Sequence, residues 1–200
     1  MSAPRTGLRT AGVAIRALLV FTVVLGVGYP LVVTGVGQLA FATRANGSLV
    51  TVDGETVGSA LIGQSFSDAD GDPLPEWFQP RPSAAGDGYD GAASSGSNWG
   101  PENDDLVSAI GERQAQISEF DGVAPDEIPA DAVTASASGL DPHISPEYAL
   151  QQVPRVATER GLPEESVREL VSDNIQNRDL GLLGEARVNV LLLNVALDEL

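Results

Sequence analysis

The side chains that could do chemistry gather around one histidine. His143 is the only histidine in the chain, and Asp141 lies two positions before it. Serine-rich stretches at residues 94–97 and 136–138 could add the nucleophile of a Ser-His-Asp triad. Such a triad needs all three groups within hydrogen-bond reach, and the chain has no Gly-x-Ser-x-Gly nucleophile elbow. Asp141-Pro142-His143 is therefore interpreted as a turn before a helix cap, and no catalytic residue is predicted.

Metal and nucleotide chemistry find no matching motif. One histidine, no cysteine and scattered carboxylates do not form a metal-ligand pattern, so no metal site is predicted. The chain also has no lysine, whereas phosphate loops of the Gly-x-x-x-x-Gly-Lys type and protein kinases both need one. These residues exclude ATP hydrolysis by this chain, and they predict no cofactor.

The elements that must position these side chains begin with a membrane span. Residues 17–43 carry no formal charge and lie between Arg16 and Arg44. As a helix this segment would extend about 40 Å, against about 30 Å of bilayer hydrocarbon. A cleavable signal peptide is the alternative, because Ala40-Phe41-Ala42 fits a small-x-small cleavage site, but an apolar region of about 7–15 residues is usual there. We therefore predict a retained transmembrane helix at residues 17–43.

The predicted span is interrupted by helix-breaking residues. Pro30 donates no backbone hydrogen bond and should kink the helix. A broken span usually packs against other helices, and small residues such as Gly35 let a neighbouring backbone come close. A plain anchor with tolerated glycines explains the same residues, so both interpretations stay open.

The arginines predict how the span is oriented. Arg5, Arg9 and Arg16 precede it with no acidic residue among them. Because positive charge collects on the cytoplasmic side of a membrane, residues 1–16 are predicted to form a cytoplasmic tail. Residues 44–200 are then predicted to form an extracytoplasmic domain at the cell membrane.

The predicted outer part is strongly acidic. It holds all 28 acidic residues and eight of the 11 arginines, which leaves a net formal charge of −20. Nucleic acid and anionic lipid head groups are therefore disfavoured as partners. A composition rich in acidic residues and without lysine is typical of proteins whose surface is solvated at high salt. We therefore expect a halophilic source, and a halophilic archaeon in particular.

The outer part is predicted to be a single α+β domain. A hairpin with Asp53-Gly54 at its turn is expected within residues 48–63. Three helices are predicted after it, at about 104–120, at 145–161 and at 164–175. The second begins at Ser145, ends at Gly161 and should have a kink or break at Pro154. A buried strand is predicted at 187–193. Strands at both ends with helices between them are typical of the α+β class.

Several longer motifs give the chain a family resemblance. They are residues 29–35 (YPLVVTG), 58–64 (GSALIGQ), 78–82, 94–98, 133–146, 155–157, 160–162 and 183–194. In this order they resemble the C subunit of the Kdp potassium-transporting ATPase, a bacterial and archaeal pump. The resemblance covers nearly the whole chain after residue 10. It departs at Pro163, where the family often has a serine cap, and in the acidic loop 67–76.

The resemblance implies a non-catalytic accessory subunit of an ATP-driven, high-affinity potassium uptake complex. Its implied partners are a channel-like potassium-translocating subunit, a P-type ATPase subunit and the lipid bilayer. The family is also described as a catalytic chaperone that raises the affinity of the ATPase subunit for ATP. Direct contact with ATP disagrees with the orientation predicted above, because ATP is cytoplasmic. A membrane-anchored extracytoplasmic hydrolase or a binding module is the alternative.

Polar loops and the broken span are the expected partner contacts. The residues expected to make them are Tyr29, Pro30, Gly35, Phe78, Gln79, Arg81, Ser95, Ser97, Asn98, Ser136, Ser138 and Asp141. The loops among them would suit an outer domain that lies over the mouth of the channel-like subunit.

Overall fold

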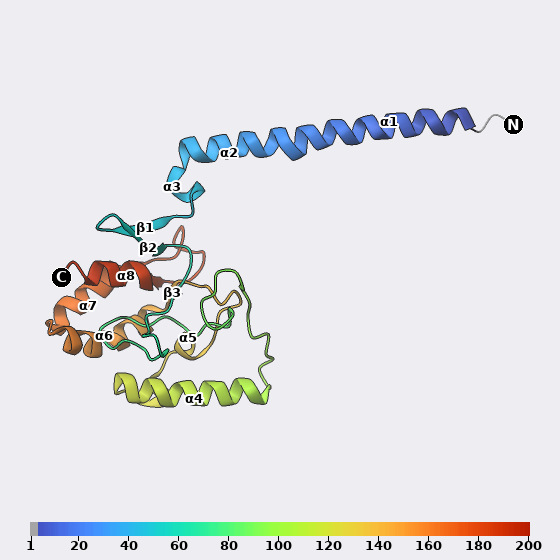
Figure 1. The fold of residues 1–200 in the computed structure, drawn as a ribbon. Helices are drawn as coiled ribbons and strands as arrows, with labels where there is room; N and C mark the ends of the chain where they lie inside the picture. The colour runs from blue at the N-terminus through green and yellow to red at the C-terminus, as the bar shows by residue number, and fades with distance from the viewer. Residues whose placement is uncertain (1–3) are drawn as a thin grey trace. The chain divides into compact units, whose positions relative to one another are not determined.

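The computed structural model describes residues 4–200 and divides the chain after Ser48 into two compact units (Figure 1). Residues 1–3 of the predicted cytoplasmic tail lie outside the described residues. The first unit is a helical run made of α1 (Pro4–Val23), the π-helix η1 (Val24–Gly28) and α2 (Tyr29–Ala40), followed by the short helix α3 (Ala42–Ala45). Within it, residues Gly7–Ala40 are long and apolar enough to cross a membrane.

The disturbance expected at Pro30 takes the form of a π turn. The backbone N–H of Tyr29 donates to the carbonyl of Val24, five residues earlier, and the helix continues on both sides. Pro30 cannot donate to the carbonyl of Gly26, and its ring crowds that turn. A π turn before a proline widens the helix at the crowded position. The hydrogen bonds there change from four to five residues apart, and the helical run continues without a break.

The apolar run ends as a helix earlier than its composition suggests. Phe41 has φ −139°, which stops α2 at Ala40, and its N–H donates to the carbonyl of Gly37. The predicted boundaries of the tail, the span and the outer domain stay predictions.

The second unit begins with the predicted hairpin. Strands β1 (Leu49–Val52) and β2 (Glu55–Ser59) pair antiparallel, with a register shift between Val50 and Thr51. Asp53 and Gly54 at the turn both have positive φ, as a two-residue type I′ turn requires. This confirms the hairpin.

The three predicted helices are confirmed. They are α4 (Asp104–Asp121), α6 (Pro146–Arg160) and α7 (Glu164–Asp173), and the short elements η2 (Pro125–Glu127) and α5 (Ala130–Val133) lie between α4 and α6. The Ser145 hydroxyl accepts the N–H of Tyr148, and Gly161 ends α6 in a left-handed conformation. Pro154 lies inside α6 without breaking it, so of the expected kink or break the break is wrong, and the kink stays a prediction.

The predicted strand at 187–193 is wrong beyond its first three residues. Strand β5 (Arg187–Asn189) ends where Asn189 accepts the N–H of Leu192 and caps helix α8 (Val190–Leu197). A short run of buried apolar residues fits a helix as well as a strand, so its periodicity does not distinguish them. The capping side chain of Asn189 decides the outcome.

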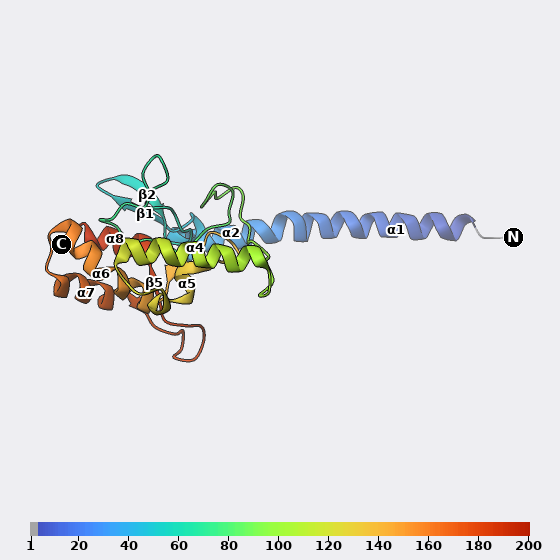
Figure 2. The same ribbon diagram turned by 90° about the horizontal axis from the view of Figure 1, so that it is seen from below.

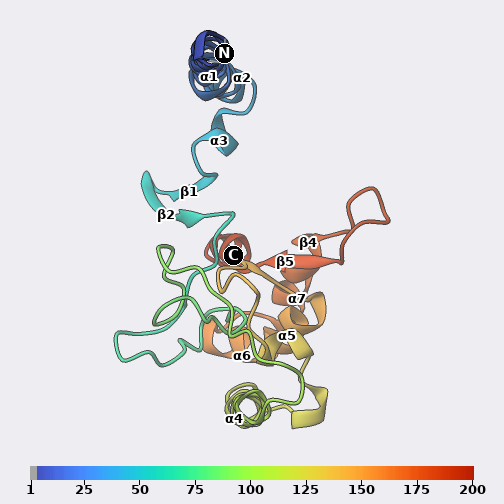
Figure 3. The same cartoon turned by 90° about the vertical axis from the view of Figure 1, so that its right-hand side faces the viewer.

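A small antiparallel sheet joins the end of the chain to its middle. β5 lies between β3 (His143–Ile144) and β4 (Ile175–Gln176), with Ile144 and Ile175 both opposite Val188. Helices α6 and α8 pack against β5, and α7 packs against α6 and α8 (Figures 2 and 3). The core is made mainly of Val153, Val156, Val167, Val171, Val188, Leu193 and Phe78, all fully buried. The α+β class is therefore confirmed.

Candidate functional site

A segment without helix or strand structure, residues 75–79, runs through the domain and is paired by side chains instead of by a neighbouring strand. The Asn194 side chain accepts the N–H of Phe78 at 2.9 Å and donates to its carbonyl at 3.0 Å. Gln152 does the same for Gln79, at 2.6 Å and 3.1 Å. The two amide side chains satisfy four buried backbone groups that would otherwise cost free energy.

Arg155 closes the same segment from α6. Its guanidinium donates to the carbonyls of Pro75 and Trp77, the latter at 2.9 Å, and to the Gln152 side chain at 2.7 Å. Asp121 balances the charge through a 2.7 Å ion pair, and both side chains are almost completely buried. The guanidinium also lies 4.3 Å from the centre of the Phe120 ring. Each of the three nitrogens of this buried guanidinium thus donates to an acceptor.

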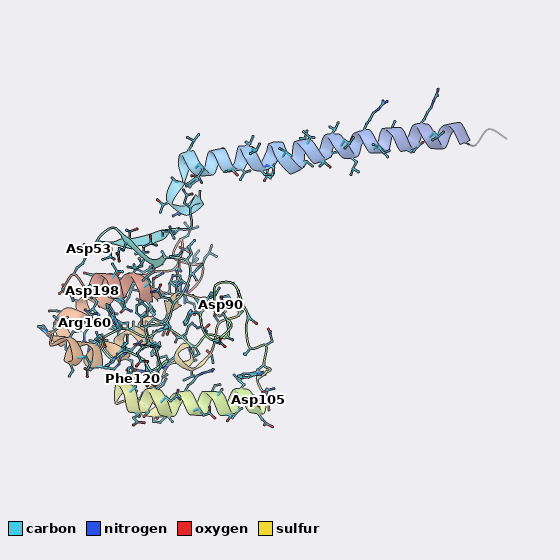
Figure 4. The ribbon with its side chains drawn as sticks, viewed as in Figure 1. Asp53, Asp90, Asp105, Phe120, Arg160 and Asp198 are labelled. Atoms are coloured by element: carbon cyan, nitrogen blue, oxygen red, sulfur yellow. The ribbon has the colours of Figure 1, made fainter. Side chains whose placement is uncertain are left out.

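A second arginine holds the outer end of the segment. Arg160 donates to the Glu76 carbonyl at 2.9 Å and pairs with Asp198 at 2.8 Å, so the ends of α6 and α8 are joined (Figure 4). Its guanidinium covers the Trp77 ring at 4.1 Å. The segment is therefore fixed along its length before it reaches the surface.

The candidate site lies two residues after this segment, at Arg81, where the chain reaches the surface. Arg81 pairs with Asp141 at 3.1 Å and donates twice to the carbonyl of Thr134, at 3.3 Å and 3.2 Å. Asp141 also accepts the backbone N–H of His143 at 3.0 Å and lies 3.2 Å from its Nδ1. Burial alone would raise the pKa of Asp141, but hydrogen bonds from His143 and the charge of Arg81 outweigh it and lower the pKa.

Tyr89 fastens the neighbouring loop to this ion pair. Its hydroxyl donates to the Arg81 carbonyl at 2.5 Å, and its backbone N–H donates to the Ser83 hydroxyl at 2.8 Å. Burial raises the pKa of Tyr89 well above its ordinary value, with the Asp141 charge acting in the same direction. The phenol is therefore a permanent hydrogen-bond donor here.

Glycines allow three loops to meet at this place. A Cβ on Gly63 would lie 2.6 Å from the Tyr89 ring and 2.7 Å from the Asp141 carbonyl oxygen. A Cβ on Gly139 would lie 2.6 Å from the Ser95 carbonyl oxygen, and Gly139 also has φ +66°. Loops around residues 63, 81–96 and 137–141 therefore form one closely packed layer, which only residues without a side chain permit.

The serines stabilise this layer instead of activating a nucleophile. Ser94 donates to the Ser138 carbonyl at 3.0 Å, and the hydroxyls of Ser136 and Ser138 lie 3.3 Å apart. Among the described residues, no serine hydroxyl is hydrogen-bonded to His143, whose Nδ1 faces Asp141. No cluster of three metal-binding side chains occurs in the part of the chain that the structure describes.

The pocket beside the ion pair is polar and open. It has a volume of ≈ 520 Å³ and is lined by Arg81, Asp141, His143, Asp131, Glu185 and Arg187, among others. Charges of both signs face it, so it offers a partner a set of hydrogen-bonding and ionic contacts.

The expected contact residues divide into three groups. Phe78 and Gln79 are buried, so their side chains fix the segment and are not presented to a partner in this conformation. Arg81 and Asp141 form the half-buried pair, while Ser95, Ser97, Asn98 and Ser138 are exposed and Ser136 is partly so. Tyr29, Pro30 and Gly35 are exposed on the helical run of the first unit. Contact by the exposed residues stays a prediction.

Arg155, Asp121, Gln152 and Asn194 are structurally important residues that sequence reasoning missed. The signal that could have found them is a polar residue on the face of a helix whose other residues are apolar and buried. Gln152 stands beside Val153 in α6, and Asn194 follows Leu193 in α8; both polar side chains are fully buried.

Known proteins match this chain over nearly its whole length. The family described as the K+-transporting ATPase c chain, KdpC, matches residues 11–199. A potassium-transporting ATPase KdpC subunit of Kineococcus radiotolerans is 55% identical over 190 residues, 95% of this chain and 93% of that protein. Proteins of the same name from Mycobacterium tuberculosis and Caulobacter vibrioides are 52% and 54% identical, covering 94% and 92% of this chain and 96% and 90% of their own lengths.

These relatives are bacterial, so the expectation of a halophilic archaeal source is not supported. The motifs at residues 29–35 and 183–194 lie inside the matched region, and so does the whole Arg81–Asp141 site. The chain therefore belongs to the KdpC family, the c chain of the K+-transporting ATPase.

Proposed function

We propose that this chain is a non-catalytic accessory subunit of an ATP-driven, high-affinity potassium uptake complex. Its role is to stabilise the assembly of a channel-like potassium-translocating subunit with a P-type ATPase subunit. The observation that carries the proposal is the family match over residues 11–199, together with relatives named as potassium-transporting ATPase subunits.

The architecture supports a docking role. The helix at Gly7–Ala40 is long enough to anchor the chain in the bilayer. The loop layer around Arg81 and Asp141 is fixed by the hydrogen bonds and close glycine contacts described above. Its loops therefore do not have to become ordered when a partner binds. Preorganised polar loops with a half-buried ion pair suit recognition, whereas the absence of a serine on His143 within residues 4–200 gives hydrolysis no support.

The proposed orientation places residues 1–16 in the cytoplasm and the second unit outside, on the charge asymmetry of the sequence. Any effect on the affinity of the ATPase subunit for ATP would then pass through the assembled complex. Direct contact between ATP and residues 49–200 would need the opposite orientation.

The test is purification of the tagged chain in mild detergent from cells that also produce the other pump subunits. We expect stable co-elution with a channel-like membrane protein and a P-type ATPase. A monodisperse chain that elutes alone would contradict the proposal. Protease added to intact spheroplasts should cut the second unit, whereas full protection would contradict the orientation.

A further inference from the structure

The connection between β4 and β5, residues 177–186, exposes three leucines. We call it the leucine loop. Leu180, Leu182 and Leu183 are 91%, 82% and 61% exposed, and no other part of the second unit gathers three such side chains in four residues. The loop stands away from the rest of the domain in two perpendicular views (Figures 2 and 3). Grouped exposed leucines mark a surface that a partner covers.

The loop is held in shape by its own backbone. Asp179 and Leu183 exchange two hydrogen bonds of 2.9 Å, and the N–H of Gly181 donates to the Arg178 carbonyl at 3.0 Å. An ion pair of 3.6 Å between Asp179 and Arg187 closes its base. The leucines are thus presented on a fixed turn, which lowers the entropy cost of docking.

Leu180 occupies a position where a leucine is unfavourable for the chain itself. Its φ is +55°, a left-handed conformation in which a Cβ is strained and for which glycine or asparagine is preferred. The side chain is also almost fully exposed, so it contributes nothing to the core. Neither folding nor solubility explains a leucine there, which points to a contact made by its side chain.

Charge separates a protein partner from a lipid one. The leucine loop holds Arg178, Asp179 and Glu185 beside Arg187, so its charges balance within a domain that is otherwise strongly acidic. An acidic domain is repelled by anionic head groups, and the loop tip has neither the basic excess nor the aromatic side chains of a membrane-binding segment. An apolar tip beside charges of both signs is instead typical of a protein interface, in which an apolar centre is surrounded by a polar rim.

The base of the leucine loop is continuous with the candidate site. Gly184, Glu185 and Arg187 line the same pocket as Arg81 and Asp141. A partner that covers the polar loops at this pocket would therefore meet the leucines at its edge. The polar surface would set the register of the contact, and the leucines would supply its apolar area.

We propose that the leucine loop is an apolar anchor that inserts into a nonpolar socket on another subunit of the potassium ATPase complex. The inference rests on the proposed function, since it needs the complex, but it assigns the contact to a surface that the family match does not identify.

The test uses the full chain, tagged and produced together with the other subunits. Leu180→Gly and the double variant Leu180→Ser/Leu182→Ser should each lower co-purification of the partner subunits at least tenfold in mild detergent. Leu180→Gly is decisive, because glycine relieves the strained φ and should leave the loop folded. Val107→Ser, which removes a side chain 60% exposed on α4, is the matched control and should leave co-purification unchanged.

A site-specific probe separates protein from lipid. The chain has no cysteine, so Leu182→Cys gives a unique attachment site for a benzophenone crosslinker or a nitroxide. We expect crosslinks to a partner subunit from Leu182→Cys and none from Val107→Cys. A nitroxide on the lone chain in nanodiscs that is accessible to oxygen and not to a water-soluble nickel relaxant would overturn the proposal in favour of lipid.

The possible failures are distinguishable. If the unmodified chain does not co-purify with other subunits, the proposed function fails. If the unmodified chain co-purifies and Leu180→Gly co-purifies equally well, only the leucine-loop proposal fails.

Discussion

The side chain of Asn194 pairs with both backbone polar groups of Phe78 across 116 residues of sequence. It imitates a strand partner for a segment that has none. A residue in the last helix thereby determines the path of the chain toward Arg81 and the candidate site.

Asn194→Leu should destabilise the second unit by about 2–5 kcal/mol, because it leaves a buried N–H and a buried carbonyl unpaired. The thermal midpoint of the full chain in detergent, followed by near-ultraviolet circular dichroism of Trp77 and Trp99, measures the loss. Gln116→Leu, at an exposed position of α4, is the control and should change stability little. Equal midpoints for the two variants would contradict the role of Asn194.

Arg155→Ala should cost about 3–5 kcal/mol, because Asp121 would remain as a buried charge without its partner. Arg155→Lys keeps the charge but loses the planar fork that reaches Asp121, Gln152 and two carbonyls, so it should restore stability only in part. Arg168→Ala breaks an exposed pair with Glu164 and should cost no more than about 0.5 kcal/mol. Chemical unfolding curves of the three variants test this order.

Gly63→Ala should destabilise the loop layer by about 1–3 kcal/mol, since the new methyl group would overlap the Tyr89 ring and the Asp141 carbonyl oxygen. Gly100→Ala is the matched control, because its Cβ would meet no atom within 4 Å. Differential scanning calorimetry compares the two. A Gly63→Ala protein as stable as Gly100→Ala would show that the loops can separate at no cost.

Acid should weaken the candidate site through Asp141. Its pKa is lower in the folded chain than its ordinary value of 3.8, so the unfolded chain binds the proton more readily. The stabilisation by the charged form is present above pH 3.8 and is lost as the pH falls through the lower folded value. Asp141→Asn should be less stable than the unmodified chain at pH 7, and the difference should shrink below pH 3.8. Parallel unfolding curves across that range would contradict this.

The helical run should matter for assembly and not for insertion. Outside the backbone of its own helix, no atom lies within 4 Å of a Cβ built on Gly35, so Gly35→Leu should insert normally and interfere only where another helix packs closely. Pro30→Leu should replace the π turn with a regular helix. Both variants should reduce co-purification with the pump subunits while membrane fractionation stays unchanged. Normal co-purification of both would favour the plain anchor.

Local signals predicted much of the fold. The hairpin at Asp53-Gly54 and the helices capped by Ser145 and ended by Gly161 follow from turn and cap chemistry, which acts over a few residues. Residues 190–193 were predicted as part of a strand and form the start of α8 instead. Their side chains are almost all apolar, so they lack the periodicity that distinguishes a helix from a strand.

The candidate site was only partly predictable. Arg81 and Asp141 were expected as contact residues, but their 3.1 Å pairing is a property of the tertiary structure. Phe78 and Gln79 were expected at a surface and are buried instead, because their partners Asn194 and Gln152 come from distant helices. Spacing along the sequence cannot reveal pairs of this kind.

The Phe78–Asn194 pairing also sets an order of events during biosynthesis. Residues 75–79 leave the ribosome long before α8, so their backbone must stay hydrated or be shielded until translation has almost finished. The domain core can therefore close only after α8 has emerged from the ribosome.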